Sequence, residues 1–196
     1  MENFISLDVE ATSLNGNTGF PYAIAAVVYR NGIQAESINV SCPLQGEMSW
    51  WVENHPELHS IQNSELTTYE DMMEQFANFY KYHACRNENG EIQYTDWGAV
   101  NYNATPILFH CGMVVEGNLF FQLTKGGLLK EGESPMTPID VADYLRMAGE
   151  DPASVDSYVE RHGLKKAEGQ THDPMFDCVQ AATAYLHLIE RLRVTI

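Results

Sequence analysis

The chain has 196 residues, and 44% of them are hydrophobic, which is enough for one domain with an ordinary core. Twenty-seven acidic residues stand against eleven basic ones, so the formal net charge is −16. Such a chain lacks the basic stripe that a long nucleic-acid footprint needs. Two interpretations remain open: the protein binds a short stretch of strand with metal ions supplying positive charge, or it binds no nucleic acid.

Four scattered cysteines, Cys42, Cys85, Cys111 and Cys178, form no C-x-x-C pair. They are predicted to be reduced thiols of a cytoplasmic protein. The first residues do not combine a basic segment with an apolar one, so no secretory signal peptide is predicted. No apolar run reaches the roughly 18 residues of a membrane span, so no membrane segment is predicted either.

Three short strands are predicted at the start of the chain. Residues 4–10 are apolar on both faces, as is usual for a buried strand. Residues 22–30 and 33–40 flank Asn31-Gly32, a dipeptide that favours a two-residue hairpin. At least two of these strands are therefore expected to be antiparallel.

The rest of the chain is predicted to be mainly helical, with a fourth strand at residues 106–110. The helices share an apolar face or a capping residue at one end, and they are expected at 70–84, 114–123, 137–149, 155–162 and 174–192. This order predicts an α/β fold, with a mixed sheet whose first strands are antiparallel and with helices packed on both faces. We predict a single domain over residues 1–196, with an elaborated segment at about 43–105.

Acidic side chains stand at the ends of predicted strands and at the start of the last helix. Asp8 and Glu10 lie two residues apart on the first strand, so its period places them on one face. Glu116 lies just past the fourth strand. His172 and Asp177 open the last helical pattern as His-x-x-x-x-Asp. Segments far apart in the chain thus supply four carboxylates and one histidine.

These residue types suit the hydrolysis of a phosphodiester bond. Two divalent cations about 4 Å apart can stabilise the attacking and the leaving oxygen together. Hard cations such as Mg²⁺ prefer oxygen ligands, and carboxylates supply both oxygen and negative charge. A histidine titrates near neutral pH and can accept the proton of an attacking water. The pattern therefore predicts a two-metal phosphodiesterase.

In these motifs the chain resembles the DEDDh branch of the 3′–5′ exonucleases, which share a ribonuclease H-like fold. The family's first motif, Asp-x-Glu at the end of the first strand, matches residues 8–10, and its third motif matches residues 172–177. Each motif alone is weak, but their joint order along the chain makes the resemblance more specific. The pair Trp50-Trp51 also resembles a segment of some phage-encoded members.

The resemblance implies a role for each of these side chains. Asp8, Glu10, Glu116 and Asp177 would be the ligands of two Mg²⁺ or Mn²⁺ ions. His172, on the loop before the last helix, would be the general base. The family has an aspartate in its second motif, so Glu116 is a departure with a side chain one methylene longer. Two other second-motif ligands, Asn118 and Asp96, therefore stay open.

Four further residues are candidates for substrate binding. Thr12 and Leu14 follow the first motif, where the family contacts the 3′-terminal nucleotide. For Leu14, packing onto the core is an equally good interpretation. Lys165 and Lys166 belong to the densest basic cluster and are predicted to hold a substrate phosphate, with a solvated polar surface as the alternative.

The resemblance thus implies a metal-dependent 3′–5′ exonuclease that releases nucleoside 5′-monophosphates. The acidic composition favours a short or single-stranded DNA or RNA 3′ end as substrate. Family analogy also allows a homodimer. Two alternatives stay open: an exonuclease-like domain with impaired catalysis that serves as a binding or scaffold module, and an enzyme acting on a non-nucleic phosphodiester.

Overall fold

The computed structural model describes residues 2–13, 19–55, 67–111 and 114–194. Its elements follow in chain order: β1 (Phe4–Ala11), β2 (Pro21–Arg30), β3 (Ile33–Ser41), α1 (Trp50–Glu53), α3 (Tyr69–Ala84), β4 (Ile107–Phe109), α4 (Val115–Lys125), β5 (Ile139–Asp140), α5 (Val141–Met147), α6 (Val155–Arg161) and α7 (Pro174–Val194). Among the helices of this described part, none combines the length and apolar character that crossing a lipid bilayer requires.

The strands form one mixed sheet in the order β3-β2-β1-β4-β5. β1, β2 and β3 pair antiparallel, whereas β4 pairs parallel with both β1 and β5. Asn31 and Gly32 turn the β2–β3 hairpin with φ angles of 54° and 76°, the left-handed values that such a two-residue turn requires. The antiparallel start of the sheet is therefore confirmed.

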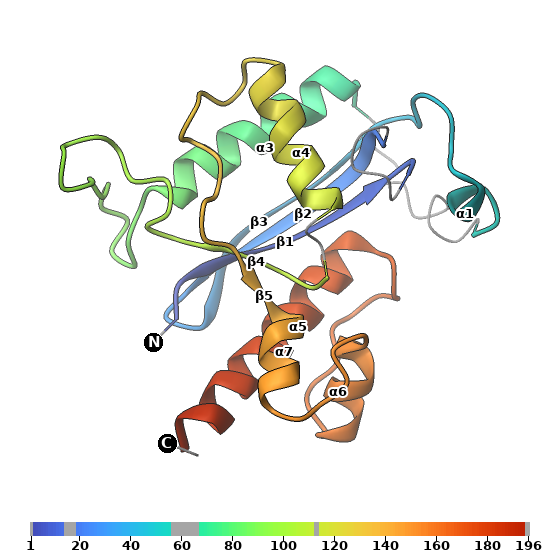
Figure 1. Ribbon diagram of the computed structural model, residues 1–196, viewed down its shortest axis with the longest axis vertical. Coiled ribbons are helices and arrows are strands. Elements are labelled where there is room, and N and C mark those ends of the chain that lie inside the picture. Colours follow the sequence, from blue (N-terminus) through green and yellow to red (C-terminus); the bar gives the residue numbers. More distant parts are fainter. Residues whose placement is uncertain (1, 14–18, 56–66, 112–113, 195–196) are drawn as a thin grey trace.

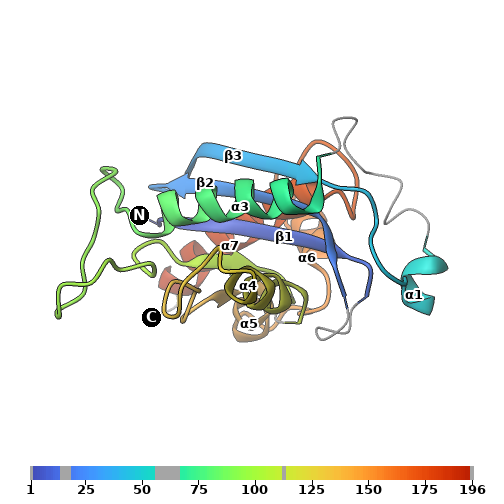
Figure 2. The same cartoon turned by 90° about the horizontal axis from the view of Figure 1, so that it is seen from above.

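Helices cover both faces of the sheet, as Figure 1 and Figure 2 show. On one face, α3 and α4 pack on a core that includes Leu7 and Val9 of β1. On the other face, α5, α6 and α7 pack on a core that includes Phe4 and Leu108. Because side chains alternate along a strand, odd positions of β1 face α3 and α4 while even positions face α7. The predicted mixed sheet with helices on both faces is confirmed.

The segment predicted as one helix from 137 to 149 is wrong in its first residues. Ile139 and Asp140 extend the sheet as β5 by pairing with Leu108 and Phe109 of β4. The Asp140 side chain then caps α5 by accepting a hydrogen bond from the Ala142 N–H at 2.9 Å. A strand of two residues is too short to show an alternating pattern, so the proline before it suggested a helix start instead.

The elaborated segment predicted between the third and fourth strands contains α1, α3 and an extended arm. The arm spans residues 86–104 and is held by two isolated bridges, Arg86–Ile92 and Tyr94–Val100. Figure 1 shows it projecting from the sheet on the side away from α1. The arm therefore lies apart from the strand ends that carry the predicted site.

Candidate functional site

The parallel pairing of β1 with β4 brings the first two motifs together. Ile5 pairs with Ile107 and Ser6 with Leu108, so both strands end at the same edge of the sheet. The chain leaves β4 at this edge and enters α4, whose first turn carries Glu116. Asp8 on β1 and Glu116 on α4 consequently line one pocket.

Two hydrogen bonds fix the start of α7 against the same strands. The Ser6 hydroxyl donates to the Cys178 carbonyl at 2.7 Å. The Cys178 thiol in turn donates to the Ala25 carbonyl of β2 at 3.1 Å. Both residues are buried, so this part of α7 is tied to the sheet. Asp177, the residue before Cys178, is thereby placed beside the carboxylates of β1.

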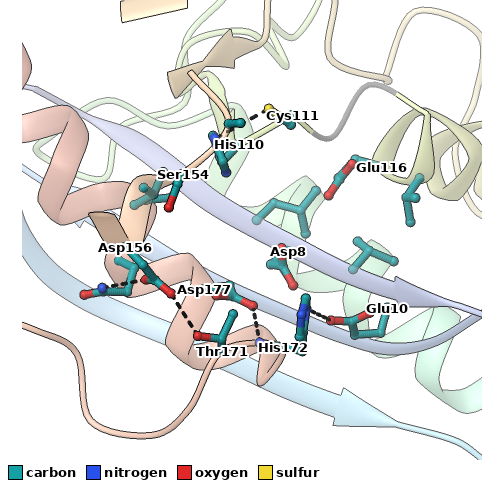
Figure 3. A pocket seen from close by; sticks show the side chains of 17 residues that line it. Asp8, Glu10, His110, Cys111, Glu116, Ser154, Asp156, Thr171, His172 and Asp177 are labelled. Carbon is teal, nitrogen blue, oxygen red and sulfur yellow. Dashed lines mark hydrogen bonds and ion pairs between the residues drawn. The ribbon is translucent and has the colours of Figure 1, made fainter. Parts of the chain in front are cut away.

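The resulting pocket has a volume of about 330 Å³, and Figure 3 shows it from close by. All five residues predicted to carry catalysis line it: Asp8, Glu10, Glu116, His172 and Asp177. They come from β1, α4, the loop before α7 and α7 itself. The five side chains selected from the sequence therefore lie around one pocket in the folded protein.

His172 is held at the rim by its backbone. Its N–H donates to Asp177 Oδ2 at 2.8 Å, and its φ of 68° is unusual for a residue with a side chain. In this conformation His172 Nδ1 lies 4.0 Å from Glu10 Oε1. Ligand-type atoms of Glu10, His172 and Asp177 all lie within 4.8 Å of one another. These three groups are close enough to share a single cation.

Glu116 has the smallest exposed fraction of the four carboxylate residues. Glu116 is only 5% exposed, and its Oε2 atom has no hydrogen-bond partner among the described residues. Burial, with further contributions from Glu10 and Asp140, raises the pKa of Glu116 to about 8. A buried carboxylate oxygen without a partner costs free energy. The position therefore favours either a bound proton or a bound cation.

The pKa values of the neighbouring carboxylates are raised as well. Burial and the Asp177 carboxylate raise the pKa of Glu10 to about 8. Burial, opposed in part by the His172 N–H and reinforced by Asp156, raises the pKa of Asp177 to about 7. Burial and the charges of Glu10 and Asp177 also raise the pKa of Asp8 well above its usual range. Like charges crowded in one pocket oppose ionisation unless a positive charge joins them.

Divalent cations fit this pocket by the chemistry of its donors. Four carboxylates supply oxygen, the ligand that Mg²⁺ and Mn²⁺ prefer, and one of these oxygens is buried without a partner. A bound cation would also supply the positive charge that these crowded carboxylates need in order to ionise. Asp8, Glu10, Glu116 and Asp177 are therefore the residues that could hold such ions.

The two alternative second-motif ligands are placed elsewhere. Asn118 lies on α4 two residues past Glu116, but its side chain donates to the Gly19 carbonyl at 2.7 Å. Asp96 is an exposed residue of the arm at 86–104. Neither of them lines the pocket, whereas Glu116 does. The geometry thus favours Glu116 as the second-motif residue.

Of the candidates for substrate binding, the three that the structure describes, Thr12, Lys165 and Lys166, do not line the pocket. Thr12 is fully buried, and its hydroxyl accepts a hydrogen bond from the Phe20 N–H at 3.0 Å, which braces the start of the following loop. Leu14 lies outside the described residues. Lys165 and Lys166 are exposed, and Lys166 Nζ lies 5.4 Å from the centre of the Phe176 ring. Their roles toward a substrate stay predictions.

Three pocket residues had no signal in the sequence. Asp156 of α6 accepts hydrogen bonds from the Thr171 hydroxyl at 2.8 Å and from the Gln180 amide at 2.9 Å. All three line the pocket on the His172 side. An aspartate in a first helical turn, a loop threonine and a helix glutamine are ordinary in isolation. Only the packing of α6 against α7 shows that they belong together.

The turn after β4 is fixed from β5. Asp140 Oδ1, which caps α5, also accepts a hydrogen bond from the Cys111 N–H at 3.1 Å. His110 Nε2 donates to the Pro152 carbonyl at 2.8 Å. Cys111 has a left-handed φ of 56° and an exposed thiol at the pocket wall. Asp140, the residue that caps α5, thus fixes Cys111 just after the end of β4.

The mixed sheet with helices on both faces is an α/β fold of the ribonuclease H-like type, and solved exonuclease structures share this fold. A structure of exonuclease I matches with a TM-score of 0.67 and 11% identity over 97% of this chain and 41% of that chain. The nuclease domain of 3′hExo, a DEDDh family member bound to rAMP, matches with a TM-score of 0.66 and 13% identity over 97% of this chain and 92% of that domain.

A third match is the zinc-bound form of the E. coli exonuclease I complex with single-stranded DNA, with a TM-score of 0.65 and 11% identity over 98% of this chain and 41% of that chain. The chain thus spans less than half of the exonuclease I chains it matches. No protein-family model and no curated protein matches the sequence. At these identities the comparisons establish the fold, and the predicted ribonuclease H-like fold is confirmed.

Proposed function

We propose that the protein is a metal-dependent 3′–5′ exonuclease that releases nucleoside 5′-monophosphates from a short or single-stranded end of nucleic acid. One observation carries the proposal: four carboxylates and a histidine, spread over more than 160 positions from Asp8 to Asp177, line a single pocket. The solved structures with this fold include exonucleases, one of them in complex with single-stranded DNA.

Asp8, Glu10, Glu116 and Asp177 would hold two Mg²⁺ or Mn²⁺ ions. When bound, such ions supply the charge that stabilises the attacking and the leaving oxygen of a phosphodiester. The protein's own contribution is to fix four carboxylates on three rigid elements, β1, α4 and α7. Rigid placement of ligands is what a site of this kind requires.

His172 is the residue we propose as general base. Its side chain is half-buried at the rim, so it reaches both the pocket and the solvent. Glu10 Oε1 lies 4.0 Å from its Nδ1 and would stabilise the imidazolium that forms when the ring accepts a proton from water. Asp177 fixes the backbone of His172 through the 2.8 Å hydrogen bond.

The strongly acidic composition supports a small substrate footprint. With 27 acidic and 11 basic residues, the surface as a whole repels a long polyanion. Contacts with the terminal nucleotides, made where bound cations offset the charge, would suffice for an exonuclease. We therefore propose a single-stranded or short end as the substrate, and expect weak binding to long duplexes.

A labelled oligonucleotide tests the proposal directly. A single-stranded substrate carrying a 5′ label is incubated with the protein and Mg²⁺ or Mn²⁺, and the products are resolved by length. We expect stepwise shortening from the 3′ end, which stops when EDTA is added. Asp8→Ala and His172→Ala should each lower the rate by at least about 100-fold, since general base catalysis alone typically contributes 10²–10⁴.

The matched control is Asp143→Ala, which removes an exposed carboxylate of α5 outside the pocket. It should retain the wild-type rate. Absence of shortening by the wild-type protein with both metals, or equal shortening by the Asp8→Ala and Asp143→Ala proteins, would refute the proposal. Calorimetry with Mn²⁺ then separates an inactive metal-binding domain from a protein that binds no metal.

A further inference from the structure

The loop before α7, residues 162–173, is held to α6 and α7 by hydrogen bonds at two points. Near its start, the Ala167 N–H donates to Gln180 Oε1 at 2.9 Å. Near its end, the Thr171 hydroxyl donates to Asp156 Oδ2 at 2.8 Å. The Gln180 amide joins the two points by donating to Asp156 Oδ1 at 2.9 Å. One chain of hydrogen bonds thus connects the loop, α6 and α7, and Figure 3 shows its bond between Asp156 and Thr171, with Thr171 next to His172.

The central members of this chain, Gln180 and Asp156, are each engaged through both of their polar side-chain atoms. Gln180 is 1% exposed, and both its oxygen and its nitrogen are engaged. Each carboxylate oxygen of Asp156 accepts a hydrogen bond. Asp156 lines the pocket, and its two hydrogen bonds connect the loop with α7. The chain of hydrogen bonds therefore serves the loop.

The residue that follows Thr171 needs such support. His172 adopts a φ of 68°, in the left-handed region that a residue with a side chain rarely occupies. Such conformations persist only when the surroundings hold them in place. Two contacts flank this backbone: the Thr171 hydroxyl on one side and the bond from the His172 N–H to Asp177 on the other. A loop freed from Asp156 would relax and carry the imidazole away from Glu10.

We infer that Asp156, Gln180 and Thr171 are positioning residues that hold the His172 imidazole at the pocket. This inference rests on the proposed function, because it assigns a purpose to the placement of the general base. The three residues act through His172 and not on the substrate. Their effect should appear in the rate of the chemical step, while cation binding by the carboxylates on β1, α4 and α7 stays the same.

A pair of substitutions at the exposed Thr171 tests the inference without disturbing the core. Thr171→Val removes the hydroxyl but keeps the shape of the side chain, whereas Thr171→Ser keeps the hydroxyl. We expect Thr171→Val to lower kcat on the order of tenfold, with KM and the calorimetric Kd for Mn²⁺ unchanged, since one hydrogen bond to a charged group is worth about that factor. Thr171→Ser should restore the wild-type kcat.

The matched control is Thr183→Val on α7, where the hydroxyl donates to the Val179 carbonyl of the same helix at 2.8 Å. This change also deletes a threonine hydroxyl but leaves the loop untouched, so kcat should not change. The decisive comparison repeats Thr171→Val in a His172→Ala background. There the substitution should have no further effect, because the group it positions is gone. An equal loss of kcat in both backgrounds would overturn the inference.

A second readout does not depend on activity. Lys165 and Lys166 are exposed in the tied loop, so trypsin cleavage at these residues, read by fragment mass, reports how firmly the loop is held. Thr171→Val should be cut several-fold faster than wild type, and Thr171→Ser at the wild-type rate. If the wild type shortens no oligonucleotide, the proposed function fails. The trypsin assay still tests whether Thr171 holds the loop, and equal cleavage of wild type, Thr171→Val and Thr171→Ser would overturn that role.

Discussion

The unpartnered carboxylate of Glu116 gives the sharpest test of the site. In the metal-free protein its pKa is raised from 4.5 to about 8. Between these two values the folded state holds a proton that the unfolded state has released. Stability therefore falls as the pH rises from 4.5 through 8. Glu116→Gln abolishes this contribution, because the amide does not ionise.

The size of the effect follows from the shift of the pKa. At 1.36 kcal/mol per pKa unit, the ionisation of Glu116 lowers the stability of the metal-free protein by roughly 3 kcal/mol more at pH 7.5 than at pH 5. This figure is an upper bound, since the side chain can turn toward water. The unpaired amide of Glu116→Gln costs a constant amount of about 1–3 kcal/mol. The change between the two pH values is consequently the quantity to compare.

Urea unfolding in EDTA at pH 5 and pH 7.5, followed by circular dichroism, measures this quantity. With a slope of about 2 kcal/mol per molar urea, the midpoint difference between wild type and Glu116→Gln should change by up to about 1.5 M across that range. Mn²⁺ at pH 7.5 should then stabilise the wild type far more than the variant. The exposed Glu160→Gln on α6 is the control and should follow wild type throughout. Identical pH dependence of Glu116→Gln and wild type would refute the reasoning.

Three further outcomes are expected. Leu108→Ala, at a fully buried position of β4, should lower the free energy of unfolding by about 2–5 kcal/mol in urea titrations, whereas Met147→Ala, at a 70% exposed position, should change it little. Asp140→Ala should lower the free energy of unfolding by about 1–2 kcal/mol, because α5 loses its cap. The same change should lower nuclease activity, because Cys111 loses its hydrogen bond to Asp140. Asp143→Ala should have neither effect. In a thiol-reagent titration of the native protein, Cys111 alone should react rapidly, because the other three cysteines are buried; rapid reaction of more than one thiol would contradict the described packing.

Local patterns in the sequence determined much of this protein. The apolar run of β1 and the Asn31-Gly32 turn between β2 and β3 are short-range features, and each gave the observed element. The period of a strand placed Asp8 and Glu10 on one face, and the start of the last helix placed Asp177 in its first turn. These predictions needed no knowledge of what packs against each segment.

The tertiary structure alone decided which distant groups meet. β5 is a strand only because β4 lies beside it. Glu116 lines the pocket, whereas the side chain of Asn118 donates to the Gly19 carbonyl. Thr171 lies 15 positions from Asp156, and Gln180 lies 24 positions from it. Their hydrogen bonds form once α6 and α7 pack together. Residues so far apart carry no shared spacing in the chain, since their distance is set by helix packing and not by the local backbone.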